Sequence, residues 1–318
     1  MKDKKKIIQT LQQDNNFLVV SHLNPDGDAI GSSVALGFIL KKLNKNFSLY
    51  NASGLPEKFS WLKLPKKFCN TLPPQKPKWI IILDCGDKNR MGDEILPWLE
   101  TCKTINMDHH LHNPLFGSLN LVNENASCVG EIIADLCVDL NIEITGALAE
   151  AIYLAIISDT GYFTYSNTTS YAHFITSKMI EQGLNVGKIN SILSQTWSLN
   201  KIKLMSLVLE TTELFQSGEI AVIQITQSMF KKTNTGPEDC EGFINYIRNI
   251  KKVKVAVSLR EEKDNTIKFS LRSYDKVNVQ QIASNLGGGG HKNAAGGILK
   301  CSLNEAKKII INEIRKVL

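Results

Sequence analysis

Short apolar runs alternate with longer amphipathic segments along the first half of the chain. Runs rich in β-branched or apolar residues, each bounded by polar loops, predict strands at residues 17–20, 80–83 and 104–107. Apolar residues at helical spacing predict helices at residues 29–43, 128–140 and 147–158. Strands that alternate with helices are typical of a parallel sheet with helices on both faces.

The second half has a different pattern. Polar and apolar residues alternate in segments that predict half-buried strands at residues 219–226, 252–260 and 266–273. Asp264-Asn265 predicts a turn between the last two strands. One helix is expected near Pro237, because Pro-Glu-Asp is a favourable first helical turn. Another is expected after Ser302, which forms a capping box with Glu305.

This change of pattern predicts the domain organisation. Residues 186–215 have helical character and few turn-forming residues, which favours a helical connector. A length of 318 residues suits two domains rather than one or three. We therefore expect an α/β protein with a parallel-sheet domain at 1–185, a helical connector at 186–215 and a smaller α/β domain at 216–318.

The net charge of +6 is distributed unevenly along the chain. Residues 1–185 contain 17 basic and 19 acidic residues, a net charge of −2, whereas residues 186–318 contain 20 and 12, a net charge of +8. A basic second part favours an anionic ligand there. On charge alone, a solvated basic surface is an equal alternative.

Composition indicates the cellular compartment in which the protein is expected. Hydrophobic residues make up 43% of the chain, but no apolar run approaches the ~18 residues that a membrane span needs. The charged N-terminus has no apolar segment behind it. Seven cysteines without a C-x-x-C pair favour reduced thiols over disulfides or a thiolate zinc site. We expect a soluble, cytoplasmic protein without a membrane partner; the oligomeric state stays open, with a homodimer among the options.

Acidic and imidazole side chains follow each predicted strand of the first domain. They are His22, Asp26 and Asp28 after the first strand, Asp84 after the second, and Asp108, His109 and His110 after the third. In an open parallel sheet, the ligand crevice lies outside the carboxyl ends of the strands. We therefore expect these side chains to meet at one edge of the sheet.

A further acid, Asp159, ends an apolar helical segment. Four clustered carboxylates, those of Asp26, Asp28, Asp84 and Asp159, would repel one another and raise their pKa values unless cations neutralised them. Each motif alone has a simpler explanation, such as a helix cap at Asn-Pro-Asp-Gly-Asp or a turn at Asp84. The joint pattern of acids and imidazoles at strand ends favours a metal site.

The types of ligand select the metal and the reaction. Carboxylates and imidazoles without thiolates suit Mn²⁺ or Mg²⁺ better than Zn²⁺, and the imidazoles favour Mn²⁺. Two such ions ~3.5 to 4 Å apart can lower the pKa of a water and stabilise both oxygens of an in-line displacement. The predicted chemistry is the hydrolysis of a phosphoester.

The second domain contains a candidate anion-binding segment, Gly287-Gly288-Gly289-Gly290-His291-Lys292. Glycines let backbone amides approach a phosphate, and His291 and Lys292 add donors. Because the segment continues through small residues into an apolar run, a tightly packed loop is favoured over a flexible linker. Arg272 on a neighbouring strand is a candidate for bidentate phosphate recognition, with a solvated surface arginine as the alternative.

These segments resemble a known family. Four of them resemble the motifs of the DHH phosphoesterase superfamily: HLNPDGDAIGS at 22–32, Asp84 with Arg90-Met91-Gly92, MDHH at 107–110 and SDTGYFTYSNTT at 158–169. GGGGHKNAAG at 287–296 resembles the signature of the DHH-associated C-terminal domain. The resemblance covers nearly the whole chain. The compact two-domain length is similar to the branch of nanoRNases and pAp phosphatases.

The resemblance implies a role for each motif residue. One Mn²⁺ would be bound by His22, Asp26 and Asp84, and the other by Asp28, Asp84, His109 and Asp159. Asp108 would orient a neighbour or act as a weak ligand, and His110 would contact the scissile phosphate. Arg272 and the segment Gly288, Gly289, Gly290 and His291 would hold the substrate's phosphate or terminal nucleotide. The implied substrates are short oligoribonucleotides, cut to mononucleotides, and 3′-phosphoadenosine 5′-phosphate, cut to AMP.

Other functions stay open at this point. The runner-up is a phosphodiesterase for linear or cyclic dinucleotides such as cyclic di-AMP. A single-strand-specific exonuclease is disfavoured because additional binding domains are lacking. An inorganic pyrophosphatase is disfavoured by the GGGGH segment. A nucleotide-binding module without activity is disfavoured because an acid stands at every expected position.

Overall fold

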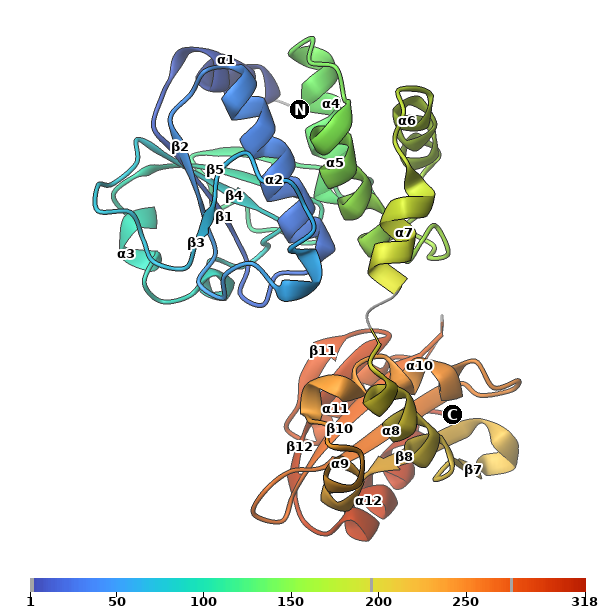
Figure 1. The fold of residues 1–318 in the computed structure, drawn as a ribbon. Coiled ribbons are helices and arrows are strands. Elements are labelled where there is room, and N and C mark those ends of the chain that lie inside the picture. Colours follow the sequence, from blue (N-terminus) through green and yellow to red (C-terminus); the bar gives the residue numbers. More distant parts are fainter. Residues whose placement is uncertain (1–2, 195–196, 275–276) are drawn as a thin grey trace. The chain divides into compact units, whose positions relative to one another are not determined.

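The chain folds into two α/β units, each with its own sheet and its own core. The computed structural model describes residues 3–194, 197–274 and 277–318 (Figure 1). The units are Met1–Thr196 and Trp197–Leu318. Within the described residues, no helix combines the length and the apolar character that crossing a membrane requires.

The first unit contains a six-stranded parallel sheet in the order β3-β2-β1-β4-β5-β6. Its strands are β1 (Phe17–Ser21), β2 (Phe47–Tyr50), β3 (Phe68–Cys69), β4 (Trp79–Leu83), β5 (Lys103–Asp108) and β6 (Leu119–Val122). The strand order reverses between β1 and β4. In such a sheet, a ligand crevice forms at this switch point, beyond the carboxyl ends of the strands.

Helices of the first unit gather on one face of its sheet. The central ones, α2 (Gly27–Lys42), α4 (Val129–Asp139) and α5 (Gly146–Asp159), lie side by side (Figure 1). Gly31 allows α2 to approach α5 closely, because a Cβ there would lie 2.5 Å from the carbonyl oxygen of Ala151. The same core includes residues of α1 (Lys4–Gln13), α6 (Ser170–Glu181) and α7 (Val186–Ser194).

The other face of this sheet is covered by shorter elements. A second cluster of buried residues includes Leu18, Ile80 and Met91, under η2 (Lys88–Met91), α3 (Leu96–Leu99) and their loops. The 3₁₀ helix η1 (Glu57–Phe59) follows β2. Every residue of β1 and β4 is buried because both faces are covered, which explains why these strands are apolar throughout.

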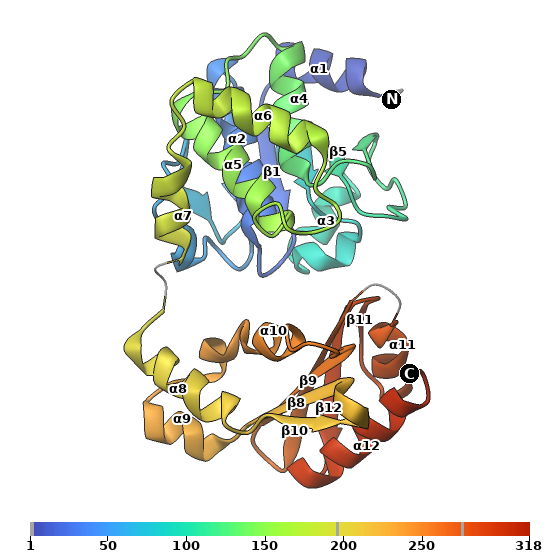
Figure 2. The ribbon, with the colours of Figure 1, turned by 90° about the vertical axis from the view of Figure 1, so that its right-hand side faces the viewer.

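The second unit contains a six-stranded mixed sheet in the order β11-β12-β10-β9-β8-β7. Its strands are β7 (Glu213–Phe215), β8 (Ile220–Ile225), β9 (Val255–Glu261), β10 (Thr266–Ser273), β11 (Gly289–His291) and β12 (Ala294–Lys300). Figure 2 shows α11 (Val279–Asn285) and α12 (Leu303–Arg315) on one side, and α8 (Leu199–Leu209), α9 (Gln227–Thr233) and α10 (Phe243–Arg248) on the other. The 3₁₀ helices are η3 (Gln216–Gly218) and η4 (Pro237–Cys240).

The fold class predicted from the sequence is confirmed, and several local predictions need correction. The predicted connector 186–215 is divided between the units: α7 belongs to the first and α8 to the second, and residues 195–196 lie outside the described part. Its last residues form β7 instead of helix, because they pair with β8. The helix predicted near Pro237 is the short η4, and α10 begins only at Phe243.

The glycine-rich segment is largely a β-hairpin rather than a loop. Gly289–His291 forms β11 and pairs with β12. A Cβ at Gly288 would lie 2.2 Å from the carbonyl oxygen of Gly296, so only glycine fits there. Gly290 has a φ of 140°, and a Cβ there would lie 2.5 Å from the carbonyl oxygen of Ala294 and 2.6 Å from the Cα of Ala295. Close contact between backbones within this hairpin therefore explains these two glycines.

Candidate metal centre

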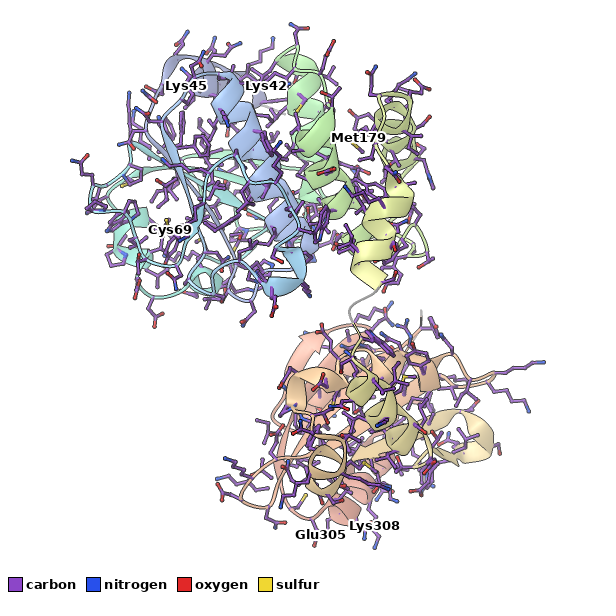
Figure 3. All side chains as sticks on the ribbon, viewed as in Figure 1. Lys42, Lys45, Cys69, Met179, Glu305 and Lys308 are labelled. Atoms are coloured by element: carbon purple, nitrogen blue, oxygen red, sulfur yellow. The ribbon has the colours of Figure 1, made fainter. Side chains whose placement is uncertain are left out.

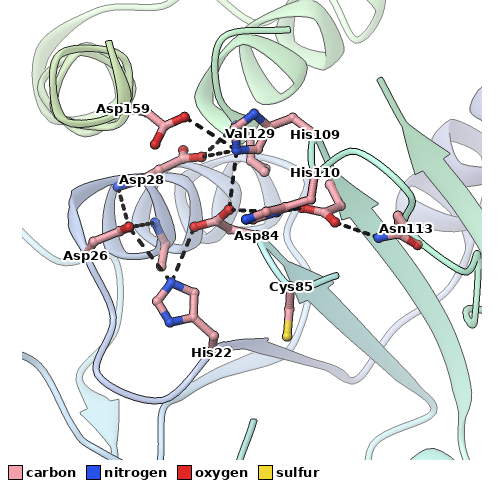
Figure 4. A network of polar contacts seen from close by, with 12 residues as sticks. His22, Asp26, Asp28, Asp84, Cys85, His109, His110, Asn113, Val129 and Asp159 are labelled. Atoms are coloured by element: carbon pink, nitrogen blue, oxygen red, sulfur yellow. Dashed lines mark hydrogen bonds and ion pairs between the residues drawn. The ribbon is translucent and has the colours of Figure 1, made fainter. Parts of the chain in front are cut away.

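Acidic and imidazole side chains meet at the carboxyl ends of β1, β4 and β5 (Figure 4). His22 follows β1, Asp84 follows β4, and Asp108 is the last residue of β5. Asp84 has a φ of 54°, which is uncommon for a residue other than glycine. Its backbone N–H still donates to the carbonyl oxygen of Met107, so the chain turns immediately after the strand. The Asp84 side chain is buried at the centre of the cluster.

His22 and Asp26 lie on one side of Asp84. His22 Nε2 is 3.5 Å from Asp84 Oδ2 and 3.9 Å from Asp26 Oδ1. His22 Nδ1 donates to the carbonyl oxygen of Leu23 at 2.7 Å, so Nε2 is the ring nitrogen directed toward the acids. Asp26 also caps α2, because its Oδ1 accepts from the backbone N–H groups of Asp28 and Ala29. The Asp26 side chain therefore both caps α2 and belongs to the cluster of acids and imidazoles.

Asp28 is held by the N-terminus of another helix. Its Oδ2 accepts from the backbone N–H of Val129 at 2.7 Å, and its Oδ1 accepts from Gly130 at 3.0 Å. The hydroxyl of Ser32 donates to Oδ1 as well. The first amides of α4 have no partner within their own helix, so a carboxylate is favoured at this position. These contacts orient a side chain that is only 1% exposed.

His109 lies on the other side of Asp84, among three carboxylates. Its Nε2 is 3.4 Å from Asp159 Oδ2, 3.6 Å from Asp84 Oδ1 and 3.9 Å from Asp28 Oδ2. Asp159 reaches this position as the last residue of α5. Two atoms that bind one cation at about 2.1 Å lie about 3 to 3.5 Å apart. The His109–Asp159 separation lies in this range, and the other two exceed it by at most about 0.4 Å.

His110 and Asp108 form a pair next to this cluster. Their closest atoms, His110 Nδ1 and Asp108 Oδ1, are 2.7 Å apart. The amide of Asn113 donates to the other oxygen of Asp108. His110 Nδ1 also lies 3.6 Å from Asp84 Oδ1. Asp108 is fully buried, whereas the His110 side chain keeps about a third of its surface exposed. Asp108 is thus placed to orient His110.

Burial and neighbouring charges shift the pKa values of the carboxylates and imidazoles in the cluster. Burial, with Asp84 and Asp159 nearby, raises the pKa of Asp28 well above its usual value. Burial raises the pKa of Asp159 to about 6. Burial alone would lower the pKa of His109, but the contact with Asp84 and the charges of Asp28 and Asp159 raise it to about 10. The pKa of Asp84 falls below its usual range, because His109 and His22 outweigh the effect of burial.

The donor set fits divalent metal ions. Three triads have donor atoms within 4.8 Å of one another, namely His22-Asp26-Asp84, Asp28-His109-Asp159 and Asp84-His109-His110. Asp84 occurs in two of them, which suits a ligand shared by two ions. Cys85 is the neighbouring thiol, but burial raises its pKa to about 12 and it donates to the carbonyl oxygen of Asp87. The donors are therefore oxygen and imidazole nitrogen, the types that Mn²⁺ and Mg²⁺ accept.

The structure brings together every residue of the first unit that the sequence marked as a site candidate. The residues marked for phosphate recognition, Arg272 and Gly288 to His291, belong to the second unit. Arg272 lies on β10, and Gly289, Gly290 and His291 lie on β11. The side chain of His291 lies outside the described part of the structure.

Sequence reasoning missed the residues that hold the cluster in place. Asn167 donates to the carbonyl oxygens of Asp159 and Ser127, at 3.0 and 3.1 Å. Glu131 is buried and accepts from the hydroxyls of Ser127 and Thr169. The signal available in the sequence was weak: Asn167 and Thr169 belong to the SDTGYFTYSNTT motif, whereas nothing marked Glu131 beyond its place in the first turn of a helix.

Comparison with known domain families finds a match for each part of the chain. Residues 16–156 match the model of the DHH family, N-terminal domain, and residues 218–316 match the model of the DHHA1 domain. The first match includes His22, Asp26, Asp28, Asp84 and His109. The second includes Arg272 and the glycine-rich hairpin.

Comparison with curated and solved proteins extends the likeness to most of the chain. A Thermus thermophilus protein named bifunctional oligoribonuclease and PAP phosphatase NrnA is 29% identical over 94% of this chain and 89% of its own length. The Bacillus subtilis protein of the same name is 27% identical over 96% of both chains. The crystal structure of an exopolyphosphatase-related protein from Bacteroides fragilis is 27% identical, with a TM-score of 0.88 over 98% of this chain and 95% of its own.

Proposed function

Because this chain belongs to the DHH family and carries a DHHA1 domain, we propose that it is a metal-dependent phosphoesterase for short nucleic acid substrates. It hydrolyses short oligoribonucleotides to mononucleotides and 3′-phosphoadenosine 5′-phosphate to AMP. The names of the relatives at 27% and 29% identity support both substrates, since the likeness extends over nearly the full length of each chain. The observation that carries the proposal is the cluster of six acids and imidazoles around Asp84.

We assign the cluster to two divalent cations. His22, Asp26 and Asp84 bind one, and Asp28, Asp84, His109 and Asp159 bind the other. Mn²⁺ is the proposed ion, with Mg²⁺ as the alternative, because imidazoles contribute to both sets. When bound, such a pair lowers the pKa of a water and neutralises charge on a phosphoryl group.

The chain's own residues then orient the reaction. Asp108 holds the imidazole of His110 through a 2.7 Å contact, so the ring presents its other nitrogen to a non-bridging phosphate oxygen. The contact also raises the pKa of His110, which favours the charged form that stabilises an anion. Arg272 binds the substrate's phosphate or terminal nucleotide, together with Gly288, Gly289, Gly290 and His291.

A substrate panel with Mn²⁺ tests this function. The substrates are a diadenylate, a pentanucleotide RNA, 3′-phosphoadenosine 5′-phosphate and cyclic di-AMP. We expect turnover of the first three, and Asp84→Asn should reduce it by at least about a thousandfold, since the shared ligand loses its charge. Asp93→Asn is the matched control, because Asp93 is an exposed acid outside the cluster. Inactivity of the wild type on both RNAs, or normal turnover in Asp84→Asn with an unchanged circular dichroism spectrum, would refute the proposal.

A further inference from the structure

A pocket of about 280 Å³ opens on one face of the second unit's sheet. Strands β9 and β10 contribute Ser258, Arg260, Lys268, Ser270 and Arg272 to its lining. The facing wall is formed by η4 and the start of α10. This volume lies just below that of typical ligand pockets, roughly 300 to 1,000 Å³, so the pocket suits part of a ligand rather than a whole oligonucleotide.

Three lining residues form a regular row on β10. Lys268, Ser270 and Arg272 alternate with the buried residues Ile267, Phe269 and Leu271, so their side chains point to the same face. Neighbours in the row are about 7 Å apart, and Lys268 is about 14 Å from Arg272 along the strand. One step of the row is on the scale of the distance between successive phosphates of an extended single strand, so Lys268 lies about two steps beyond Arg272.

Lys268 has a second positively charged residue beside it, on the neighbouring strand β9. Lys268 lies directly opposite Arg260 in the antiparallel pair β9–β10, an arrangement that is unfavourable by itself. Arg260 is held by Glu262 and by the carbonyl oxygen of Pro237, the latter at 3.0 Å. Among the residues that the structure describes, Lys268 forms no ion pair. Because Glu262 already offsets the charge of Arg260, an anion bound here would be stabilised mainly by Lys268.

Polar groups near Lys268 also favour the binding of an anion in this pocket. Ser270 stands between Lys268 and Arg272 in the row, and Ser258 on β9 lies directly opposite it. Their hydroxyls make no hydrogen bond to another described residue, so both can donate to a ligand. Two acids line the pocket as well: the Glu238 carboxylate lies against the backbone of Gly236, and Glu241 is exposed. Three cations and these two acids line the pocket. Glu262 pairs with one of the cations, Arg260, whereas no described acid pairs with Lys268.

We propose that Lys268, with Arg260 and the hydroxyls of Ser258 and Ser270, forms a second phosphate site for longer oligoribonucleotides. The site binds a phosphate about two nucleotides away from the one held by Arg272. This inference rests on the proposed function, because it assigns the pocket to the same substrate. A compound with two neighbouring phosphates, such as 3′-phosphoadenosine 5′-phosphate, spans one step of the row and does not reach Lys268. The site therefore strengthens the binding of chains of about four or more nucleotides and leaves the smallest substrates unaffected.

The test replaces the charge of Lys268 while keeping a side chain of similar length. Lys268→Met should raise KM for pentaadenylate about tenfold, as expected for the loss of one charge-assisted phosphate contact. KM for 3′-phosphoadenosine 5′-phosphate should change less than twofold. Lys308→Met is the matched control, because Lys308 is exposed on α12, on the other face of the sheet (Figure 3). It should leave KM for both substrates unchanged.

A binding measurement separates this inference from the proposed function. Fluorescence anisotropy of labelled pentaadenylate in EDTA reports affinity without hydrolysis, and Lys268→Met should weaken it about tenfold. The slope of log affinity against log salt concentration should become shallower by about 0.7, the value for one phosphate contact on a single strand. Equal losses for pentaadenylate and 3′-phosphoadenosine 5′-phosphate, no loss, or an equal loss in Lys308→Met would overturn the second site. A wild type that binds pentaadenylate through Lys268 without cleaving any RNA would instead refute the proposed function alone.

Discussion

At the scale of single residues, the candidate metal centre gives several side chains two roles. Asp26 caps α2 and faces His22, and Asp28 binds the first amides of α4 while facing His109. The backbone contacts leave each carboxylate little freedom to rotate. A cation would therefore meet ligands whose orientation is already determined, which lowers the entropic cost of binding it.

The protonation of His109 leads to a prediction about metal binding. The metal-free imidazole is charged at about pH 7.5, because its pKa is raised to about 10, whereas a metal binds the neutral ring. Mn²⁺ should therefore release about one proton on binding, and its apparent affinity should rise as the pH increases from about 6 to 9. Below about pH 6, protonation of Asp159 should weaken binding further.

Calorimetry in two buffers that differ in ionisation enthalpy counts the released protons. His109→Gln should reduce the difference between the buffers, and any difference that remains reports proton release from the carboxyls, such as Asp28, whose pKa is also raised. His173→Gln should preserve it, since His173 stacks on Phe163 instead of facing the acids. Equal binding enthalpies for the wild type in both buffers would contradict the proton release.

At the scale of secondary-structure elements, hydrogen bonds join the segments that deliver Asp28 and Asp159. Asp28 is held by the N-terminus of α4, and the loop before α4 contains Ser127. Asn167 connects the carbonyl oxygen of Ser127 to that of Asp159, at the end of α5. One amide side chain thus links the segments that position two candidate ligands from distant parts of the chain, in addition to the packing of α2, α4 and α5.

Removing this amide should affect metal affinity more than stability. Asn167→Ala should weaken Mn²⁺ binding about tenfold, since changes behind metal ligands commonly cost tenfold or more. The free energy of unfolding of the metal-free protein should fall by about 1 kcal/mol. Asn190→Ala is the matched control, because Asn190 accepts a hydrogen bond from Tyr153 and should lower stability without changing metal affinity. Titration calorimetry and thermal unfolding measure the two effects, and equal metal affinities in both variants would refute the role of Asn167.

The central elements of the fold could be predicted because their patterns are strong. Strands β1 and β4 are apolar throughout, and α12 begins with the expected capping box. The short strands β3 and β6 lack such a pattern, because pairing at the edges of the sheet stabilises them more than their own sequence does. The candidate ligands could be named because acids follow apolar strands. Glu131 and Asn167 could not, because their distant partners, Thr169 and the Ser127 carbonyl, become neighbours only through tertiary packing.

At the scale of the whole molecule, charge is divided between the units. The first unit contains 18 basic and 19 acidic residues, a net charge of −1, and the second contains 19 and 12, a net charge of +7. The acids of the first unit include the candidate metal ligands, and the second unit carries the cations of the β10 row. This division predicts that metal binding and anion binding respond to different mutations and to different solution conditions.

Arg272 offers the sharpest test of this division. Arg272→Met should raise KM for pentaadenylate and for 3′-phosphoadenosine 5′-phosphate alike, by at least about tenfold, because it removes the charged phosphate contact that we propose for every substrate. Affinity for Mn²⁺ should stay unchanged, because the candidate ligands all belong to the first unit. Arg315→Met makes the same chemical change at an exposed position of α12 and should alter neither value. A loss of Mn²⁺ affinity in Arg272→Met would show that metal and anion binding are not divided in this way. An increase in KM confined to pentaadenylate would instead refute the phosphate contact proposed for Arg272.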